Sequence, residues 1–149
     1  MIVLGTENDL DRMMPLFERF QEEFSPWNSF SEDKLRQSFD QLIFSDQLQG
    51  LFAIAETDEG KPGGFILAVA VPSLFSEETQ TQELGFFVIP EERKSRMAKN
   101  LLNTYQYWAE NVAKTDICSL CIMTDERVGK LYERMGYKKA ETSYIKRIN

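Results

Sequence analysis

Residues 83–98 read ELGFFVIPEERKSRMA, and this stretch decides how the chain is expected to fold. An apolar strand runs into Pro90, then into a cationic turn, and then directly into a helical pattern. Backbone N–H groups collect at a helix N-terminus, where they favour negative charge. The basic side chains of the turn add positive charge beside them. The stretch therefore predicts a binding site for an anionic phosphate group.

The strands before this turn are predicted from apolar runs. Leu51 to Glu56 and Phe65 to Val71 are separated by DEGKPG, a connector rich in turn residues, which indicates a hairpin. Leu84 to Ile89 leads into the turn, and the polar residues 73–82 before it are predicted to form a loop. A short strand is expected at Ile2 to Leu4.

Two helices are predicted between the first strand and the hairpin. The first follows a cluster of cap-forming residues at positions 6–9, and the second follows Ser31, a favourable N-cap. Their apolar residues repeat at helical spacing: Leu10, Met13, Met14, Phe17, Phe20 and Phe24, then Leu35, Phe39, Leu42 and Ile43. Such a stripe is more typical of core packing than of a substrate groove, which is the alternative. Trp27 is expected to pack between the two helices, and the alternative is that it covers an acceptor pocket.

The chain after the turn predicts a helix and a buried strand. Apolar residues from Ala98 to Val112 repeat at helical spacing, and Ile117 to Met123 is apolar almost throughout. Near-continuous apolarity is typical of a strand that is buried on both faces. The strand at 84–89, this helix and the strand at 117–123 form a βαβ unit, so the two strands are expected to be parallel neighbours.

The last part of the chain predicts a helix and closing strands. Asp125 can cap a helix that carries Val128, Leu131, Tyr132 and Met135 and ends at Gly136. Residues 137–148 are predicted to return as one or two strands.

Composition restricts the function. The 149 residues are expected to form one compact domain. A formal net charge of −7 disfavours nucleic-acid binding, which needs a basic surface, and suits a cationic acceptor or a basic protein partner. The chain has no histidine, which excludes Ser/His and Cys/His catalytic pairs and His-containing zinc sites. Acid–base chemistry is therefore expected from Glu, Asp, Tyr, Cys, Lys or a water chain.

Location and cysteine chemistry are also predicted from the sequence. No apolar run approaches the roughly 18 residues of a membrane helix and no basic leader is seen, so a cytoplasmic protein without a membrane span is expected. Cys118 and Cys121 form the run CSLC. A redox pair needs a helix N-terminus, whereas this run reads as a buried strand. Two residues alone cannot fill a zinc site, so no metal is expected.

Two segments resemble the GNAT superfamily of N-acetyltransferases, and the order of elements resembles that fold over essentially the whole chain. Residues 83–102, ELGFFVIPEERKSRMAKNLL, are similar to the family's strand, V-x-P, R/Q-x-x-G-x-G/A turn and helix. Residues 125–146, DERVGKLYERMGYKKAETSYIK, are similar to its N-x-x-A-x-x-x-Y-x-x-x-G-F segment. The resemblance implies an α/β (α+β), GNAT-like fold in a single domain over residues 1–149. A central mixed sheet of about six to seven strands, flanked by about four helices, is expected.

The resemblance implies acetyl-coenzyme A (acetyl-CoA) as co-substrate. In the family, the strand before the turn offers its backbone to the pantetheine arm where two parallel strands splay apart, here at Phe87 and Val88. The turn binds the pyrophosphate, and the positions carried over are Arg93, Lys94, Ser95, Arg96, Met97, Ala98 and Lys99. Lys94 and Arg96 stand where the family has glycine, which permits close backbone approach and unusual φ. Arg96 therefore either narrows the cradle or turns outward to pair with a phosphate.

Three positions carry the implied chemistry. Tyr132 matches the family tyrosine that protonates the departing thiolate, and simple packing is the alternative. Glu83 begins the strand where several family members place a carboxylate that removes the amine's proton, and proton loss through ordered water is the alternative. Asp125 replaces the family's asparagine beside the cofactor, where a structural role as helix cap is favoured.

The implied activity is transfer of an acetyl group from acetyl-CoA to a primary amine of a small molecule or protein by direct attack. The alternative is a non-catalytic GNAT-like structural or interaction module with a degenerate cofactor turn; the end of the chain, LYERMGY…ETSYIK, resembles short GNAT-like proteins of bacteriophages. This alternative is considered because both turn glycines of the family are replaced in this chain. A monomer and a homodimer both stay open.

Overall fold

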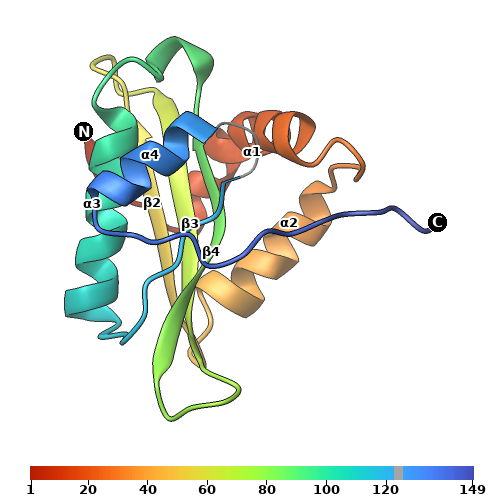
Figure 1. The fold of residues 1–149 in the computed structure, drawn as a ribbon. Helices are drawn as coiled ribbons and strands as arrows, with labels where there is room; N and C mark the ends of the chain where they lie inside the picture. Colours follow the sequence, from red (N-terminus) through yellow and green to blue (C-terminus); the bar gives the residue numbers. More distant parts are fainter. Residues whose placement is uncertain (123–125) are drawn as a thin grey trace.

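A four-stranded antiparallel sheet forms the centre of the molecule (Figure 1). The structure, a computed structural model, describes residues 1–122 and 126–149. The strands lie in chain order: β1 (Ile2–Leu4), β2 (Gln49–Glu56), β3 (Pro62–Pro72) and β4 (Thr79–Val88). β2 and β3 form the predicted hairpin, with Ile54 opposite Phe65. β4 pairs with β3 along its length, so its other edge faces the C-terminal part of the chain.

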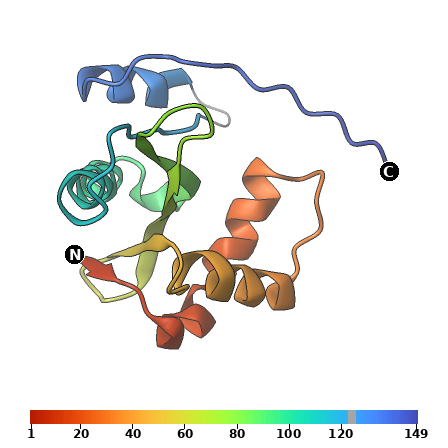
Figure 2. The same ribbon diagram turned by 90° about the horizontal axis from the view of Figure 1, so that it is seen from below.

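Helices cover both faces of the sheet (Figures 1 and 2). α1 (Leu10–Phe24) and α2 (Glu32–Ser38) lie on one face, and α3 (Met97–Tyr107) and α4 (Glu126–Arg134) lie on the other. Short turns extend them: the 3₁₀ turns η1 (Glu7–Asp9) and η3 (Pro90–Glu92), and the π-helical turns η2 (Phe39–Ile43) and η4 (Trp108–Val112). The four flanking helices agree with the prediction.

The side chains of β2 and β3 build a core on each face. Ala53 and Ile66 pack towards α3, whereas Ile54 and Phe65 pack towards α1. On the α1 side the core is largely aromatic, and the rings of Phe17 and Phe65 meet edge to face with centroids 4.9 Å apart. The aromatic stripe of α1 is thus mainly core, as favoured from the sequence.

Local hydrogen bonds fix where the helices begin and end. The Thr6 backbone N–H donates to Asp9 Oδ2 at 2.8 Å before α1. The Ser31 hydroxyl accepts the N–H of Lys34 at 3.3 Å and caps α2 as predicted. Gly136, with φ of +93°, ends α4, because a left-handed residue after a helix strongly favours glycine. The predicted cap at Asp125 lies outside the described residues.

The predicted strand at 117–123 is wrong over its described part. Ile117 makes one parallel bridge with Gln80, which confirms the direction and the neighbour, but residues 118–122 form no strand. They are not buried on both faces either, since Ile117 is 44% and Ile122 48% exposed. The reason is that the backbone N–H groups of Ser119 and Cys121 donate to side-chain oxygens of β4 instead of to its carbonyls.

The strand count and the C-terminal tail also differ from the prediction. The sheet has four strands instead of six to seven, and it is antiparallel apart from the bridge at Ile117. Residues 138–149 form no strand and are exposed, with Tyr144 93% exposed. They run from α4 across to the side of α1 and α2 (Figures 1 and 2). The loop before β4 is shorter than predicted, because β4 already begins at Thr79.

Within the described ranges, no helix is both long and apolar enough to cross a membrane.

Candidate active site

The turn between β4 and α3 lies where the sequence placed it. β4 ends at Val88, η3 follows at Pro90–Glu92, and α3 begins at Met97. The side chains of Phe87 and Val88 are both buried, one on each face of the sheet. Only their backbone is therefore available to a ligand at the β4 edge.

The start of α3 offers backbone donors. Ser95 Oγ accepts the N–H of Met97 at 3.1 Å, and the Ser95 hydroxyl donates to the carbonyl of Glu92 at 2.7 Å. In the described part of the chain, the N–H groups of Ala98 and Lys99 have no acceptor, as expected for the first turn of a helix. Two donors thus point out of the helix start, where the macrodipole favours an anion.

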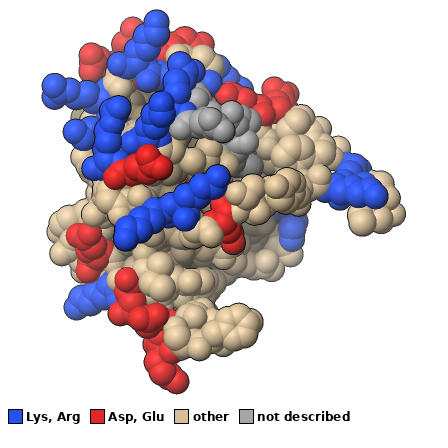
Figure 3. All heavy atoms as spheres, in the orientation of Figure 1, with Lys and Arg blue, Asp and Glu red and all other residues tan. Residues whose placement is uncertain are grey.

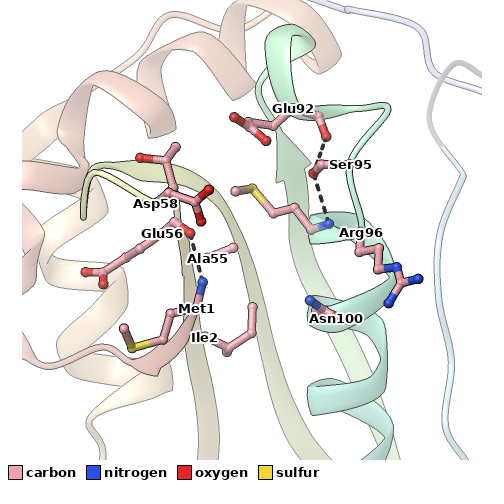
Figure 4. Close-up of a pocket in the computed structure, with 11 residues that line it drawn as sticks. Met1, Ile2, Ala55, Glu56, Asp58, Glu92, Ser95, Arg96 and Asn100 are labelled. Carbon is pink, nitrogen blue, oxygen red and sulfur yellow. Dashed lines mark hydrogen bonds between the residues drawn. The ribbon is translucent and has the colours of Figure 1, made fainter.

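Arg96 does not distort this turn. Its φ of −81° and ψ of 1° are allowed to any residue, and among described non-glycine residues only Lys114 has a positive φ. The backbone therefore does not need glycine at position 96 for conformational reasons. The Arg96 side chain points away from the neighbouring carboxylates Glu56 and Asp58 (Figure 4). Whether Arg96 narrows the cradle or pairs with a phosphate stays a prediction.

Arg93 is held by the protein itself. Its Nε donates to the Val88 carbonyl at 2.9 Å, and Nη2 contacts both carboxylate oxygens of Glu23 at 2.7 and 2.8 Å. The guanidinium also lies over the Phe87 ring, 5.7 Å from its centroid. Arg93 ties the turn to α1 and β4, so a role in anion binding stays a prediction for this residue.

Basic side chains gather around the turn. Lys94, Arg96 and Lys99 are exposed, and Lys130 and Arg134 of α4 are exposed as well. The space-filling view shows Lys and Arg clustered over the beginning of α3 and over α4, although the chain as a whole carries −7 (Figure 3). We call this region, defined by the five residues just named, the cationic face.

A small cavity beside the turn is lined by three carboxylates together with the Met1 amine and Arg96. It has a volume of about 220 Å³ and lies between the start of α3 and the ends of β1 and β2 (Figure 4). Glu56, Asp58 and Glu92 line it, and the N-terminal amine of Met1 donates there to the Glu56 carbonyl at 3.0 Å. Three carboxylates disfavour a phosphate, so the exposed side of the turn suits an anion better than this cavity.

Glu83 and Tyr132 are brought together by the backbone of Cys121. The Cys121 N–H donates to Glu83 Oε2 at 3.0 Å, and the Tyr132 hydroxyl donates to the Cys121 carbonyl at 3.1 Å. Tyr132 comes from α4, is only 5% exposed and also packs in the core under α3. The structure thus joins the two predicted catalytic side chains through one residue that sequence reasoning did not select.

Burial changes the acidity of both groups. It raises the pKa of Glu83 to about 7, against the opposing effect of the Cys121 hydrogen bond. It also raises the pKa of the Tyr132 phenol, and the Glu83 carboxylate and the Cys121 thiol add to that rise. Near neutral pH, Glu83 can accept a proton while Tyr132 keeps its own.

β4 and residues 117–122 separate beyond Thr81. The backbones are joined at the Thr81 N–H, which donates to the Ile117 carbonyl at 2.9 Å. Further along, Ser119 and Cys121 donate their N–H groups to the side chains of Thr81 and Glu83, each at 3.0 Å. Between residues 118–122 and β4, no backbone-to-backbone hydrogen bond is found in the described chain. The β4 edge that leads to the turn is therefore not closed by a strand.

A buried ring of hydrogen bonds marks the point where the two segments separate. The Thr81 hydroxyl contacts the Tyr105 hydroxyl, which donates to the Ser119 carbonyl, and the Ser119 N–H returns to Thr81. Thr81 is 1% and Tyr105 0% exposed. This pairing was not predicted, because the pattern of the sequence identifies Tyr105 only as one apolar position of a helix.

A second, larger hollow lies on the other face of the sheet, between α1, α2 and β4. We call it the α1–α2 groove; its volume is about 550 Å³. Its apolar lining is Phe17, Phe20, Phe30, Leu35, Phe65, Leu67 and Leu84, and its uncharged polar lining is Gln21, Asn28, Ser29, Ser31 and Ser38. Its charged lining residues are Lys34 and Arg147. Phe17 and Phe20 thus serve both the core and a groove, the two alternatives weighed from the sequence.

The sequence and the structure were compared with known proteins. The family model described as "Acetyltransferase (GNAT) family" matches residues 10–137. No curated protein matches the sequence significantly.

Several solved structures share the fold. A ribosomal-protein-alanine N-acetyltransferase from Brucella melitensis biovar Abortus is 20% identical, with a TM-score of 0.71 and coverage of 99% of each chain. An aminoglycoside 6'-N-acetyltransferase from Acinetobacter haemolyticus is 19% identical, with a TM-score of 0.69 and coverage of 100% of this chain and 99% of that one. A GNAT family acetyltransferase from Staphylococcus aureus is 13% identical, with a TM-score of 0.70 and coverage of 99% and 98%. These similarities show the fold, and the family model covers most of the chain, so this protein belongs to the acetyltransferase (GNAT) family.

Proposed function

We propose that this protein transfers an acetyl group from acetyl-CoA to a primary amine by direct attack. The observation that carries the proposal is the turn after β4. There, the unpaired N–H groups of Ala98 and Lys99 lie beside exposed basic side chains, at the end of a strand whose outer edge is open. Family membership supplies the reaction class, and this geometry supports its co-substrate.

The residues present fit coenzyme A. Helix N-terminal amides and nearby cations suit a pyrophosphate, and the remaining cations of the cationic face suit a further phosphate. The backbone of Phe87 and Val88 lies on the path between the turn and Glu83, where a pantetheine arm would run. Arg96 contributes positive charge from outside the turn. Asp125, outside the described residues, keeps its predicted place beside the cofactor as part of the proposal.

Glu83 and Tyr132 have the properties that the transfer requires. Acetyl-CoA supplies a thioester; transfer forms a carbon–nitrogen bond and breaks the carbon–sulfur bond. An ammonium acceptor must first lose one proton, which Glu83 accepts, because its pKa of about 7 leaves much of it ionised at neutral pH. The amine nitrogen loses a second proton as its bond to the acetyl group forms, and the leaving thiolate gains one. Tyr132 stays protonated; its single hydroxyl proton, which goes to the Cys121 carbonyl in this structure, would turn to that thiolate as it leaves.

Calorimetric titration with acetyl-CoA tests the proposal. Binding should occur, and at a hundredfold excess over Kd it should stabilise the fold by about 2.7 kcal/mol in a thermal melt. Release of free thiol in the presence of an amine should follow. Lys61→Ala is a matched control, because Lys61 is an exposed cation of the β2–β3 turn that pairs with Glu59. No binding at millimolar acetyl-CoA would instead favour the non-catalytic module.

A further inference from the structure

We infer that the α1–α2 groove selects an aromatic or strongly apolar primary amine that also carries a carboxylate. The inference rests on the proposed function, because it names the acceptor class for that reaction. The net charge of −7 suggested a cationic acceptor. The groove instead suggests an acceptor whose anionic group is recognised by the protein.

The apolar part of the ligand follows from the lining. Phe20, Phe30, Leu35 and Leu84 are the partly exposed apolar residues of the wall, and the buried Phe17, Phe65 and Leu67 lie behind them. A groove of about 550 Å³ with such a lining falls in the size range of sites for small organic molecules.

The charged part follows from Lys34 and Arg147. In the described chain no Asp or Glu lines the groove, and neither Lys34 nor Arg147 forms an ion pair with an Asp or Glu side chain. By contrast, the nearby Arg36 pairs with Asp11 and Glu32. A groove with two cations and no anion attracts a carboxylate and repels a polycation.

The polar contacts of these two cations leave donors for a ligand. Lys34 Nζ donates to Gln37 Oε1 at 3.3 Å, which uses one of its three protons. Arg147 donates to the backbone carbonyls of Trp27 and Asn149. Arg147 thus lies across the mouth of the groove against the α1–α2 loop, with part of its guanidinium still available.

The groove reaches the proposed chemistry through β4. Leu67 of β3 and Leu84 of β4 lie at the register shift, where Gly85 pairs with Leu67 and Glu83 pairs with Ala68. Leu84 lines the groove, and Glu83 is its immediate neighbour on the opposite face. Because the groove and Glu83 lie on opposite faces of β4, the amine of a ligand in the groove would have to reach past the open outer edge of β4 to meet Glu83.

The test compares phenylalanine with phenylalaninamide, which shares its amine and ring but lacks the carboxylate. Titration calorimetry without acetyl-CoA should show phenylalanine binding at least about tenfold more tightly than the amide, as expected for one charge-assisted contact. Lys34→Gln and Arg147→Gln should each weaken phenylalanine binding by about tenfold and leave the amide unchanged. Lys61→Gln, remote from the groove, should change neither.

Three results would overturn the inference: binding of neither compound, equal or tighter binding of the amide, or unchanged phenylalanine binding in both groove variants. Because these titrations contain no acetyl-CoA, they are independent of the proposed function. Groove binding without acetyl-CoA binding would remove the acetyltransferase proposal and keep the ligand class. Acetyl-CoA binding with no preference for phenylalanine over its amide would keep the acetyltransferase proposal and remove the ligand class.

Discussion

Glu83 is joined to Tyr132 through the backbone of a single residue, Cys121, whose N–H and carbonyl they engage at 3.0 and 3.1 Å. One side chain comes from the sheet and the other from α4, so the position of α4 over β4 sets their separation. A displacement of residues 118–122 would change both contacts together. The following predictions depend on this arrangement and on the turn beside it.

Glu83→Gln should lower kcat/KM by about a hundredfold or more at pH 7, because it removes the proposed base without changing the shape of the side chain. In the wild type, kcat/KM should rise with pH until about pH 7, where Glu83 becomes ionised, and then level off. The variant should lose this inflection. A pH–rate profile for both proteins checks this, and the same inflection in the variant would assign it to the acceptor amine instead.

Glu83 should also make the fold less stable at high pH. Its pKa is raised from 4.5 to about 7, so the folded state holds its proton more tightly than the unfolded state does. Stability should therefore fall as pH rises between about 4.5 and 7, by up to about 3 kcal/mol. Urea unfolding at pH 5 and pH 8 measures the change. Glu83→Gln should remove most of it, and an equal loss in that variant would point to other groups.

Tyr132→Phe should reduce turnover more than acetyl-CoA affinity, because the hydroxyl is proposed to help the leaving thiolate. The variant also loses the hydrogen bond to the Cys121 carbonyl, which should cost about 1 kcal/mol of folding stability. Calorimetric Kd values and kcat separate the two effects. Unchanged kcat with lower stability would show that Tyr132 acts in packing alone.

Arg96→Gly and Arg96→Ala should both weaken acetyl-CoA binding, by roughly three- to tenfold, because each removes a cation from the cationic face. The loss should shrink at high salt, which screens exposed charges. Arg36→Ala is the control, since that arginine pairs with Asp11 and Glu32 on the other side of the molecule. Tighter binding by the glycine variant would show that the Arg96 side chain obstructs the turn.

Thr81→Val and Tyr105→Phe should each destabilise the fold by about 1–3 kcal/mol, because each leaves buried polar atoms of the hydrogen-bonded ring without a partner. The double variant should lose clearly less than the sum of the two, since both remove the same contact. Urea denaturation of the three variants provides the double-mutant cycle. Strictly additive losses would mean that the two hydroxyls do not interact.

The sequence predicted most of the helices and the hairpin because these elements are decided locally. Ser31, Gly136 and the apolar spacing of α1 act within a few residues of each other, and each feature was found where it was expected. The turn after β4 was likewise placed correctly, because Pro90 and the following helical pattern mark its two ends.

The errors fall where the outcome depends on distant residues. The apolar run that includes Cys118 and Cys121 reads as a strand, but whether it pairs depends on which β4 groups meet it. Thr81 and Glu83 offer side-chain oxygens there, and the apolar pattern of the run itself contains no information about them. The α1 side of the groove was weighed as an alternative, but the rest of its lining was not predicted, since Lys34, Leu84 and Arg147 come from three separated parts of the chain.

The junction between β4 and residues 118–122 has a consequence for how the family fold can vary. A backbone ladder is the same whatever the sequence, so single substitutions seldom remove one of its bonds. Here two of the hydrogen bonds end on the side chains of Thr81 and Glu83, so a substitution at either position directly changes the junction between β4 and residues 118–122. Substitutions at these two positions would thus widen or tighten the entrance to the proposed acetyl-transfer centre while the rest of the sheet keeps its register.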